Sequence, residues 1–209
     1  MILDELKQYA DECITGKRIS CKKHKWACQR FLNDLQREDF PFVWNEQEAE
    51  NIVIWFSLLR HSKGVLAGKP IELTIEQKFF LCQIYGWRDK ESGLRRFNKS
   101  FYECARKGAK SQMEAGVALY EISHGATVNG EIYETYCTGT RRDQSKIVFN
   151  ECENMLHGSP LQTKFKVTRD AITHIKTGSF LKPLSKEDKK RGDGTNPALL
   201  ILDRCTCRV

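Results

Sequence analysis

The chain changes its pattern of hydrophobic and polar positions near residue 70. Before that point apolar residues recur at helical spacing, and the clearest run is Ala49, Ile52, Val53, Phe56 and Leu59. Such positions share one helical face. The pattern predicts three helices, over residues 4–14, 21–37 and 45–59, with Ser20 and Asn45 as N-caps. We therefore expect residues 1–70 to form a helical N-terminal segment.

A second pattern starts at Leu73. Thr74 and Gln77 have the spacing of a capping box, and the helix they begin ends at Gly86. The periodicity then predicts helices over 111–123 and 141–157 and strands over 97–104, 132–138, 162–167, 171–176 and 198–202. Strands that alternate with helices are typical of an α/β fold with a mostly parallel sheet. Residues 71–209 are expected to be that domain, with a polar loop over 186–196.

Composition adds modest limits to this picture. The formal net charge is +7, which suits a polyanionic partner but equally a solvated basic surface. No apolar run is long enough to cross a membrane, and the acidic N-terminus does not resemble a secretory signal. We expect a cytoplasmic protein with reduced thiols. The nine cysteines have no regular spacing, and Cys205 and Cys207 lack a second pair and a nearby His, which argues against zinc.

The most informative stretch is Phe101 to Ser111, which predicts a strand, a turn with a glycine and then a helix. That order is typical of a phosphate-binding loop, in which amides at a helix N-terminus surround an anion. The usual pattern is G-x-x-x-x-G-K-[ST]. Here Ala105 and Ala109 replace its two glycines, whereas Lys110 and Ser111 match its end.

A phosphate loop that binds Mg²⁺ also needs a carboxylate at the end of a buried strand. The segment Ala198 to Asp203 suits this role, because an apolar run ends there in an acid. An apolar strand that ends in Asp is common in α/β proteins, so the loop and the acid have to be taken together.

Four stretches in the right order resemble the ATPase domain of the large subunit of tailed-bacteriophage terminases, the DNA-packaging motors. Residues 73–87 are similar to the family's adenine-contacting Q-motif, and 105–111 to its deviant Walker A loop. Residues 136–149 resemble the next strand and helix, and 193–203 the approach to Walker B. The resemblance implies an ASCE-type P-loop NTPase fold that uses ATP and Mg²⁺.

The resemblance also assigns roles to single residues. Lys110 would neutralise phosphate charge, Ser111 and Asp203 would hold Mg²⁺, and Gln77 would contact adenine unless it serves only as a helix cap. Arg106 would contact the γ-phosphate unless it is a surface cation. Backbone amides would line the anion at Lys107, Gly108, Ala109, Lys110 and Ser111. Arg191 is the candidate arginine finger, with Arg141 and Arg142 as competitors.

The chain departs from the family after Asp203. Arg204 follows where the family has the Glu that orients the attacking water, and a guanidinium cannot accept a proton. The chain also stops before the family's remaining core strands and its nuclease domain, so we expect a truncated subunit whose sheet is incomplete on its C-terminal side. Whether it hydrolyses ATP is left open.

Three functions therefore remain open. The first is the ATPase portion of a terminase large subunit in an infected or lysogenic bacterial host, with double-stranded DNA, the small subunit, the portal protein and other large subunits as implied partners. The second is an inactive interaction module for terminase or portal partners. The third is nucleic-acid binding through the positive charge, which would weaken steeply with salt.

Overall fold

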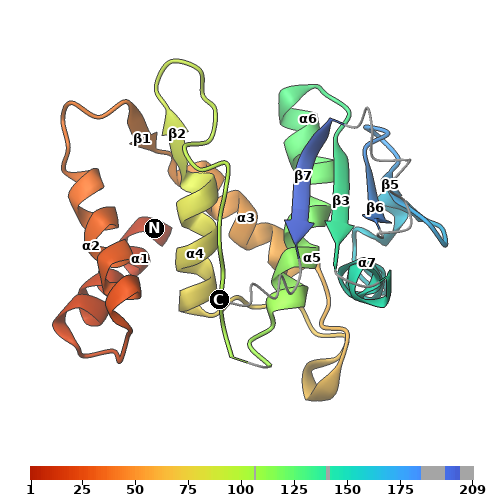
Figure 1. The fold of residues 1–209 in the computed structure, drawn as a ribbon, viewed down its shortest axis with the longest axis horizontal. Coiled ribbons are helices and arrows are strands. Elements are labelled where there is room, and N and C mark those ends of the chain that lie inside the picture. Colours follow the sequence, from red (N-terminus) through yellow and green to blue (C-terminus); the bar gives the residue numbers. More distant parts are fainter. Residues whose placement is uncertain (106, 140–141, 185–195, 203–209) are drawn as a thin grey trace. The chain divides into compact units, whose positions relative to one another are not determined.

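The computed structural model describes residues 1–105, 107–139, 142–184 and 196–202. The chain divides into two compact units, and Figure 1 shows their helices and strands. The first unit comprises residues 1–56 and 72–102, and the second comprises 57–71 and 103–209. Each unit is described by itself.

The first unit is mainly helical. Its elements are α1 (Ile2–Thr15), α2 (Lys22–Leu35), β1 (Phe42–Trp44), α3 (Glu46–Leu58), α4 (Ile75–Gly86) and β2 (Trp87–Asp89). The predicted helices are confirmed to within a few residues. Asn45 accepts a hydrogen bond from the Glu48 amide at the start of α3, as its predicted capping role requires. The N-cap of α2 is Cys21 rather than Ser20, and its side chain makes no capping hydrogen bond.

Aromatic side chains form the centre of the first unit. Phe31 lies edge-on to Trp44, Phe79 and Trp87, with ring centroids 5.5, 5.5 and 6.4 Å away. Strands β1 and β2 pair antiparallel and bring Trp44 opposite Trp87. Gly86, the last residue of α4, has no room for a side chain, since a Cβ there would lie 2.8 Å from the Trp44 ring. Edge-to-face packing of this kind fixes the two strands against the helices.

The second unit is an α/β layer built on a five-stranded sheet. Its elements are η1 (Gly64–Leu66), α5 (Lys110–Tyr120), a π-helical turn η2 (Glu121–Gly125), α6 (Ala126–Asn129), β3 (Glu134–Thr138), α7 (Arg142–Leu156), η3 (Gln162–Lys164), β4 (Phe165–Val167), β5 (Ile172–His174), β6 (Phe180–Leu184) and β7 (Pro197–Leu202). The strand order is β4-β5-β6-β3-β7. The strand β3 is parallel to β6 and β7, and the β4–β5 and β5–β6 pairs are antiparallel.

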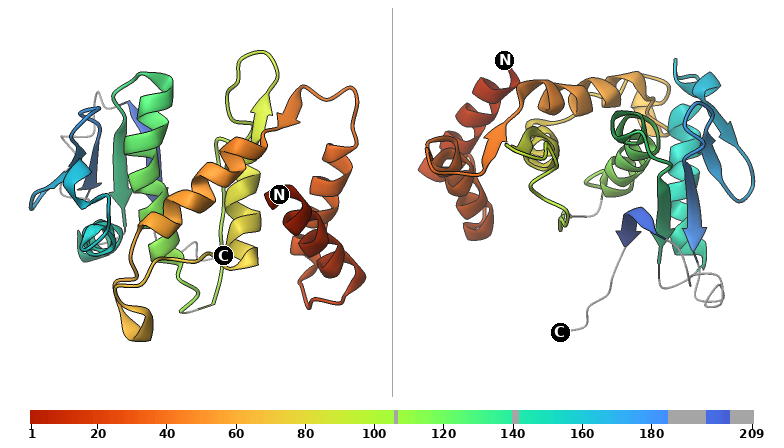
Figure 2. Two further views of the ribbon diagram at one scale, coloured as in Figure 1. Left: turned by 180° about the vertical axis from the view of Figure 1, so that it is seen from behind. Right: turned by 90° about the horizontal axis from the view of Figure 1, so that it is seen from above.

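Helices α5 and α7 pack against each other, and α7 also packs against β3 and β6. Figure 2 shows these elements from behind and from above. The buried side chains that fill the layer include Leu119, Ile122, Met155, Leu156 and Ile172. The α/β fold with a mostly parallel sheet is therefore confirmed.

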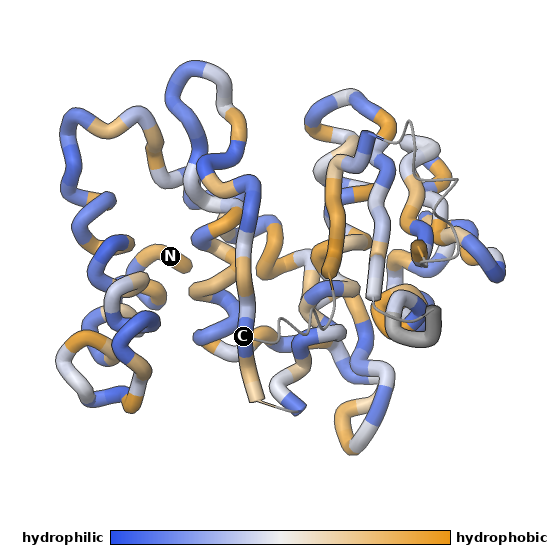
Figure 3. The backbone as a smooth tube through the Cα atoms, viewed as in Figure 1, coloured by the Kyte–Doolittle hydropathy of each residue, from blue (hydrophilic) through white to orange (hydrophobic). Residues whose placement is uncertain are grey.

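The strand β7 is strongly apolar, as its colour in Figure 3 shows. Among the described strands it pairs with β3 alone. Leu200 is 48% exposed and Leu202 54% exposed, whereas Ile201 is buried. The sheet of the second unit thus has an apolar edge at β7.

The prediction of a strand over residues 97–104 is wrong. These residues, all of which the structure describes, form no strand, and the side chain of Phe101 within this range is 86% exposed. A strand satisfies its amides and carbonyls through a neighbouring strand, and the alternation of side chains does not reveal whether such a neighbour exists. The short strands β1 and β2 and the strand β6 were not predicted. The loop predicted over 186–196 lies almost wholly outside the described residues.

Candidate functional site

The turn before α5 has an unusual backbone. Lys107 has φ 68° and Ala109 has φ 55°, and these are the non-glycine residues with positive φ in the described chain. The left-handed region costs an L-residue roughly 1–2 kcal/mol. Strain of this size is kept where surrounding structure imposes it, and it is concentrated at functional sites. The Gly108 amide donates to the Ala105 carbonyl at 3.1 Å and closes the turn.

Position 108 requires a glycine because neighbouring atoms lie close to its backbone, and not because of its φ angle. A Cβ at this position would lie 2.7 Å from the Cys104 Sγ and 3.1 Å from the Ala105 carbonyl oxygen. The Cys104 thiol in turn lies 3.7 Å from the Gly108 carbonyl oxygen. The loop therefore folds back on its own N-terminal side. That fold leaves the residues before α5 no room for a larger side chain at 108.

The N-terminus of α5 carries positive potential. Its N-cap is Ala109, which offers no side-chain capping hydrogen bond, and the first turn holds no acid. The Met113 amide donates to the Ala109 carbonyl at 3.0 Å, so the amides before it have no acceptor within the helix. Lys110, half-buried, and Lys107, exposed, add two cations. This arrangement suits an anion that accepts hydrogen bonds from several amides.

The same end of the second unit receives the carboxyl ends of two parallel strands. In Figure 1 the arrowheads of β3 and β7 point to the end at which α5 begins. Thr138 and Leu202, the last residues of these strands, are register partners. Asp203 follows Leu202 directly in the sequence. Carboxyl ends of parallel strands are the usual place for ligand sites in α/β sheets.

Three predicted site residues lie outside the described residues, namely Arg106, Arg191 and Asp203. The competitor Arg141 does too, and Arg142 begins α7. The residues that the structure describes at the loop are Lys107, Gly108, Ala109, Lys110 and Ser111, and they form one continuous turn into α5.

Gln77 lies in the first unit and makes the predicted capping box. The Gln77 Oε1 accepts a hydrogen bond from the Thr74 backbone amide at 3.0 Å, and the Gln77 backbone amide donates to the Thr74 Oγ1 at 3.5 Å. The side-chain amide nitrogen is not part of the box. The capping role is thus observed, and the adenine contact stays a prediction.

Sequence reasoning missed a contact beside the loop. His61 Nδ1 lies 3.2 Å from the Nε2 of Gln112, the third residue of α5. The neighbouring Ser62 donates to Glu151 Oε1 of α7 at 2.6 Å. These bonds tie residues 61–62 to the helices α5 and α7, which pack against each other. The sequence pattern indicated only a loop at residues 61–62, because contacts between residues far apart in the chain produce no periodicity in the sequence.

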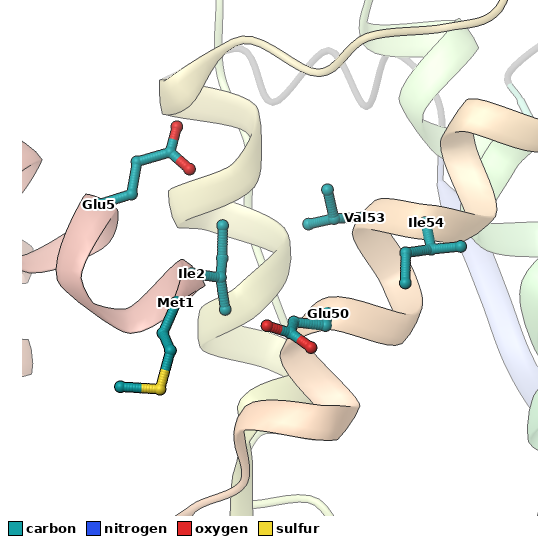
Figure 4. Close-up of a pocket in the computed structure, with 6 residues that line it drawn as sticks. All are labelled: Met1, Ile2, Glu5, Glu50, Val53 and Ile54. Carbon is teal, nitrogen blue, oxygen red and sulfur yellow. The ribbon is translucent and has the colours of Figure 1, made fainter.

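A pocket of about 420 Å³ lies in the first unit, and Figure 4 shows its lining. It is lined by Met1, Ile2, Glu5, Glu50, Val53 and Ile54. Glu5 is paired with Lys78 at 2.9 Å. The lining holds two carboxylates among apolar side chains and none of the predicted site residues. It therefore gives no support to a catalytic site.

The family model described as "Terminase large subunit, ATPase domain" matches residues 76–207. The chain belongs to this family. The matched range includes Gln77, the loop at 105–111 and Asp203. The resemblance in the sequence is thereby confirmed, and membership of an ATPase-domain family implies nucleotide binding.

A solved structure of a terminase has a similar fold. The crystal structure of the HK97 bacteriophage large terminase matches with a TM-score of 0.59 and 24% sequence identity. The match covers 74% of this chain and 30% of that one, so the chain spans under a third of the HK97 protein's length. No curated protein matches the sequence. Within the described residues, no helix is long and apolar enough to cross a membrane.

Proposed function

We propose that this chain is the ATPase portion of a terminase large subunit and binds Mg-ATP at the loop 105–111. The observation that carries the proposal is the start of α5. A turn with two left-handed residues leads there into a helix N-terminus with no capping side chain and no acid in its first turn. Such an N-terminus fits a phosphate group.

The residues of the loop have distinct roles in this proposal. Lys110 neutralises charge on the β- and γ-phosphates, while the amides of Lys107, Ala109, Lys110 and Ser111 donate to their oxygens. The Gly108 amide instead holds the turn closed by donating to the Ala105 carbonyl. The Ser111 hydroxyl and the Asp203 carboxylate are the oxygen ligands for Mg²⁺. The bound metal ion would supply charge neutralisation at the phosphates. Gln77 contacts the adenine edge, and Arg106 and Arg191 act on the γ-phosphate.

Turnover by the chain alone is expected to be slow. Orientation of the attacking water calls for a side chain that accepts a hydrogen bond, and the residue after Asp203 is Arg204. Its guanidinium donates only. Binding without appreciable hydrolysis is the behaviour that this sequence supports.

The direct test is nucleotide affinity with and without Lys110. Isothermal titration with Mg-ATP is expected to show a 10- to 100-fold loss of affinity in Lys110→Ala, the usual worth of a charged hydrogen bond of about 1.5–3 kcal/mol. Lys164→Ala is the matched control, since Lys164 is an exposed lysine of the same unit. Equal affinity of the wild type and Lys110→Ala would contradict the proposal.

In a packaging motor the partners of this chain would be double-stranded DNA, the terminase small subunit, the portal protein and other large subunits. The apolar edge at β7, with Leu200 and Leu202 exposed, favours a protein partner in addition. Co-purification with terminase components that survives Lys110→Ala would mark an interaction module. DNA affinity that falls with rising salt would mark the electrostatic contribution of the +7 charge.

A further inference from the structure

The helical hairpin of the first unit gathers two cysteines and a histidine that the proposed nucleotide site does not use. Cys13, His24 and Cys28 each offer a ligand atom, and these atoms lie within 4.8 Å of one another. Both cysteines are fully buried and His24 is half-buried. Spacing along the sequence argued against zinc, but it could not show that α1 and α2 bring Cys13 beside Cys28.

The fold of the hairpin explains the gathering. His24 and Cys28 are four residues apart in α2 and so share one face of that helix. Cys13 lies in the last turn of α1, which ends at Thr15. Gly16, with φ 85°, then turns the chain back, and the two helices pack along their length. The Tyr9 hydroxyl lies 2.8 Å from His24 Nε2 and holds the ring between the helices.

We propose that Cys13, His24 and Cys28 form a binding site for a thiophilic divalent metal ion, with Zn²⁺ as the natural occupant. Two thiolates and one imidazole are a common ligand set for zinc. Sulfur atoms at about 2.3 Å from a tetrahedral ion lie about 3.8 Å apart. The ligand atoms of Cys13, His24 and Cys28 lie within 4.8 Å of one another, so they need to move only slightly closer together to bind the ion. A water molecule would complete the four ligands of the ion.

The charge balance suits the surroundings. Zn²⁺ displaces one proton from each thiol to solvent, so the bound centre of two thiolates, an imidazole and the ion has no net charge. A neutral centre is not repelled by Lys22, Lys23 and Lys25, which surround His24 in the sequence. The His24 imidazole binds the ion through a ring nitrogen in its neutral form, and each thiol gives up its proton when the ion binds.

A bound ion would cross-link α1 to α2. Because it binds the folded hairpin and meets no preformed site in the unfolded chain, it stabilises the first unit, and the stabilisation grows with the logarithm of the free ion concentration above Kd. The role is structural and independent of the nucleotide. Cys21, exposed at the N-cap of α2, lies outside the cluster and is not required.

The test uses the full chain, reduced and stripped of metal, and titrates it with Co²⁺ and then Zn²⁺. We expect one equivalent of Co²⁺ to give a sulfur-to-cobalt charge-transfer band with tetrahedral d–d absorption, and Zn²⁺ to displace it. Zn²⁺ should also raise the melting temperature by several degrees. A wild-type chain without the tetrahedral thiolate spectrum overturns the proposal, whatever the variants do.

Variants then locate the site. Cys13→Ser and Cys28→Ser are expected to lower zinc affinity at least 100-fold. Cys82→Ser is the matched control, because Cys82 is equally buried in the same unit but stands outside the cluster, and it should keep wild-type affinity. Equal affinity in all three variants overturns the proposal. So does a Cys13–Cys28 disulfide that forms at the same rate with and without Zn²⁺, since it would mark a redox pair instead.

Discussion

The backbone of Gly108 lies against the side chain of Cys104, whose Sγ is 3.7 Å from the Gly108 carbonyl oxygen. A Cβ added to Gly108 would lie 2.7 Å from that sulfur and 3.1 Å from the Cys104 Cβ. Gly108→Ala should therefore displace the turn before α5. We expect about a tenfold loss of Mg-ATP affinity, which corresponds to about 1.4 kcal/mol.

The double variant tests whether the clash is the cause. Cys104→Ala removes the nearest atom, so Gly108→Ala with Cys104→Ala should recover part of the lost affinity, while contacts with the Ala105 carbonyl oxygen remain. Isothermal titration of the wild type, the two single variants and the double variant with Mg-ATP gives the coupling free energy between positions 104 and 108. Strictly additive effects would show that the sulfur does not set the size limit at position 108.

A second prediction concerns the left-handed residue that begins α5. Ala109 has φ 55° and ψ 25°, a conformation that glycine adopts without a Cβ penalty. Ala109→Gly should raise the free energy of unfolding by about 1 kcal/mol. Affinity for Mg-ATP should stay within a few-fold, because the proposed contacts come from backbone amides.

The matched control is Ala105→Gly, in the same exposed loop but without positive φ. There the substitution only adds freedom to the unfolded chain and should lower stability by about 0.4–1 kcal/mol. Chemical denaturation of both variants checks the opposite signs. If both variants lose stability, strain at Ala109 is not the dominant effect.

The sequence predicted most helices well because their apolar faces, caps and stops are local signals. Asn45, the Thr74–Gln77 box and Gly86 all act where the pattern placed them. The strand expected at 97–104 was wrong and β6 was missed, since strand formation depends on a partner elsewhere in the chain. At the site, the residues of the loop indicated a phosphate-binding turn and the family resemblance supported it, and its nucleotide contacts stay a prediction. The contact of His61 with Gln112 and the grouping of Cys13 with Cys28 required the fold.

A third prediction concerns a largely buried cation of the first unit, Arg96. The Arg96 guanidinium donates to Asp34 Oδ2 at 2.7 Å, and only 15% of its side chain is exposed. It also stacks on aromatic rings, with centroid distances of 4.6 Å to Phe40 and Phe97 and 5.4 Å to Trp87. Arg96→Met leaves the Asp34 carboxylate buried without this partner and should cost about 3–5 kcal/mol of stability.

Arg37 provides a matched control, since it contacts the same carboxylate and the same ring. It lies 3.8 Å from Asp34 Oδ1 and 4.3 Å from the Phe40 centroid, but 48% of its side chain is exposed. Arg37→Met should cost at most about 1 kcal/mol. Urea denaturation of the Arg96→Met and Arg37→Met variants measures the loss of stability in each. Comparable losses would show that burial is not what makes the Arg96 pair important.

The last prediction is a pH dependence of stability that arises at His174 in β5. Its Nδ1 lies 3.0 Å from Thr177 Oγ1, and that hydroxyl donates to the Ile122 carbonyl at 3.0 Å. Because the hydroxyl proton is already used, Nδ1 must be the donor to Thr177, and Nε2 carries no proton in the neutral ring. Protonation would therefore place a charge on a buried ring that lies 5.2 Å from Phe165.

Burial lowers the pKa of His174, and Lys176 and Lys164 lower it further. The unfolded chain, with an ordinary histidine pKa near about 6.5, then binds more protons than the folded one below that pH. Stability should be complete above about pH 7 and should fall as the pH drops through about 6.5. His24, whose pKa is also lowered, contributes in the same direction.

His174→Asn keeps a donor for Thr177 and removes the titration, so its melting temperature should fall less between pH 7 and pH 5 than that of the wild type. An unchanged slope in this variant would assign the whole pH dependence to other groups.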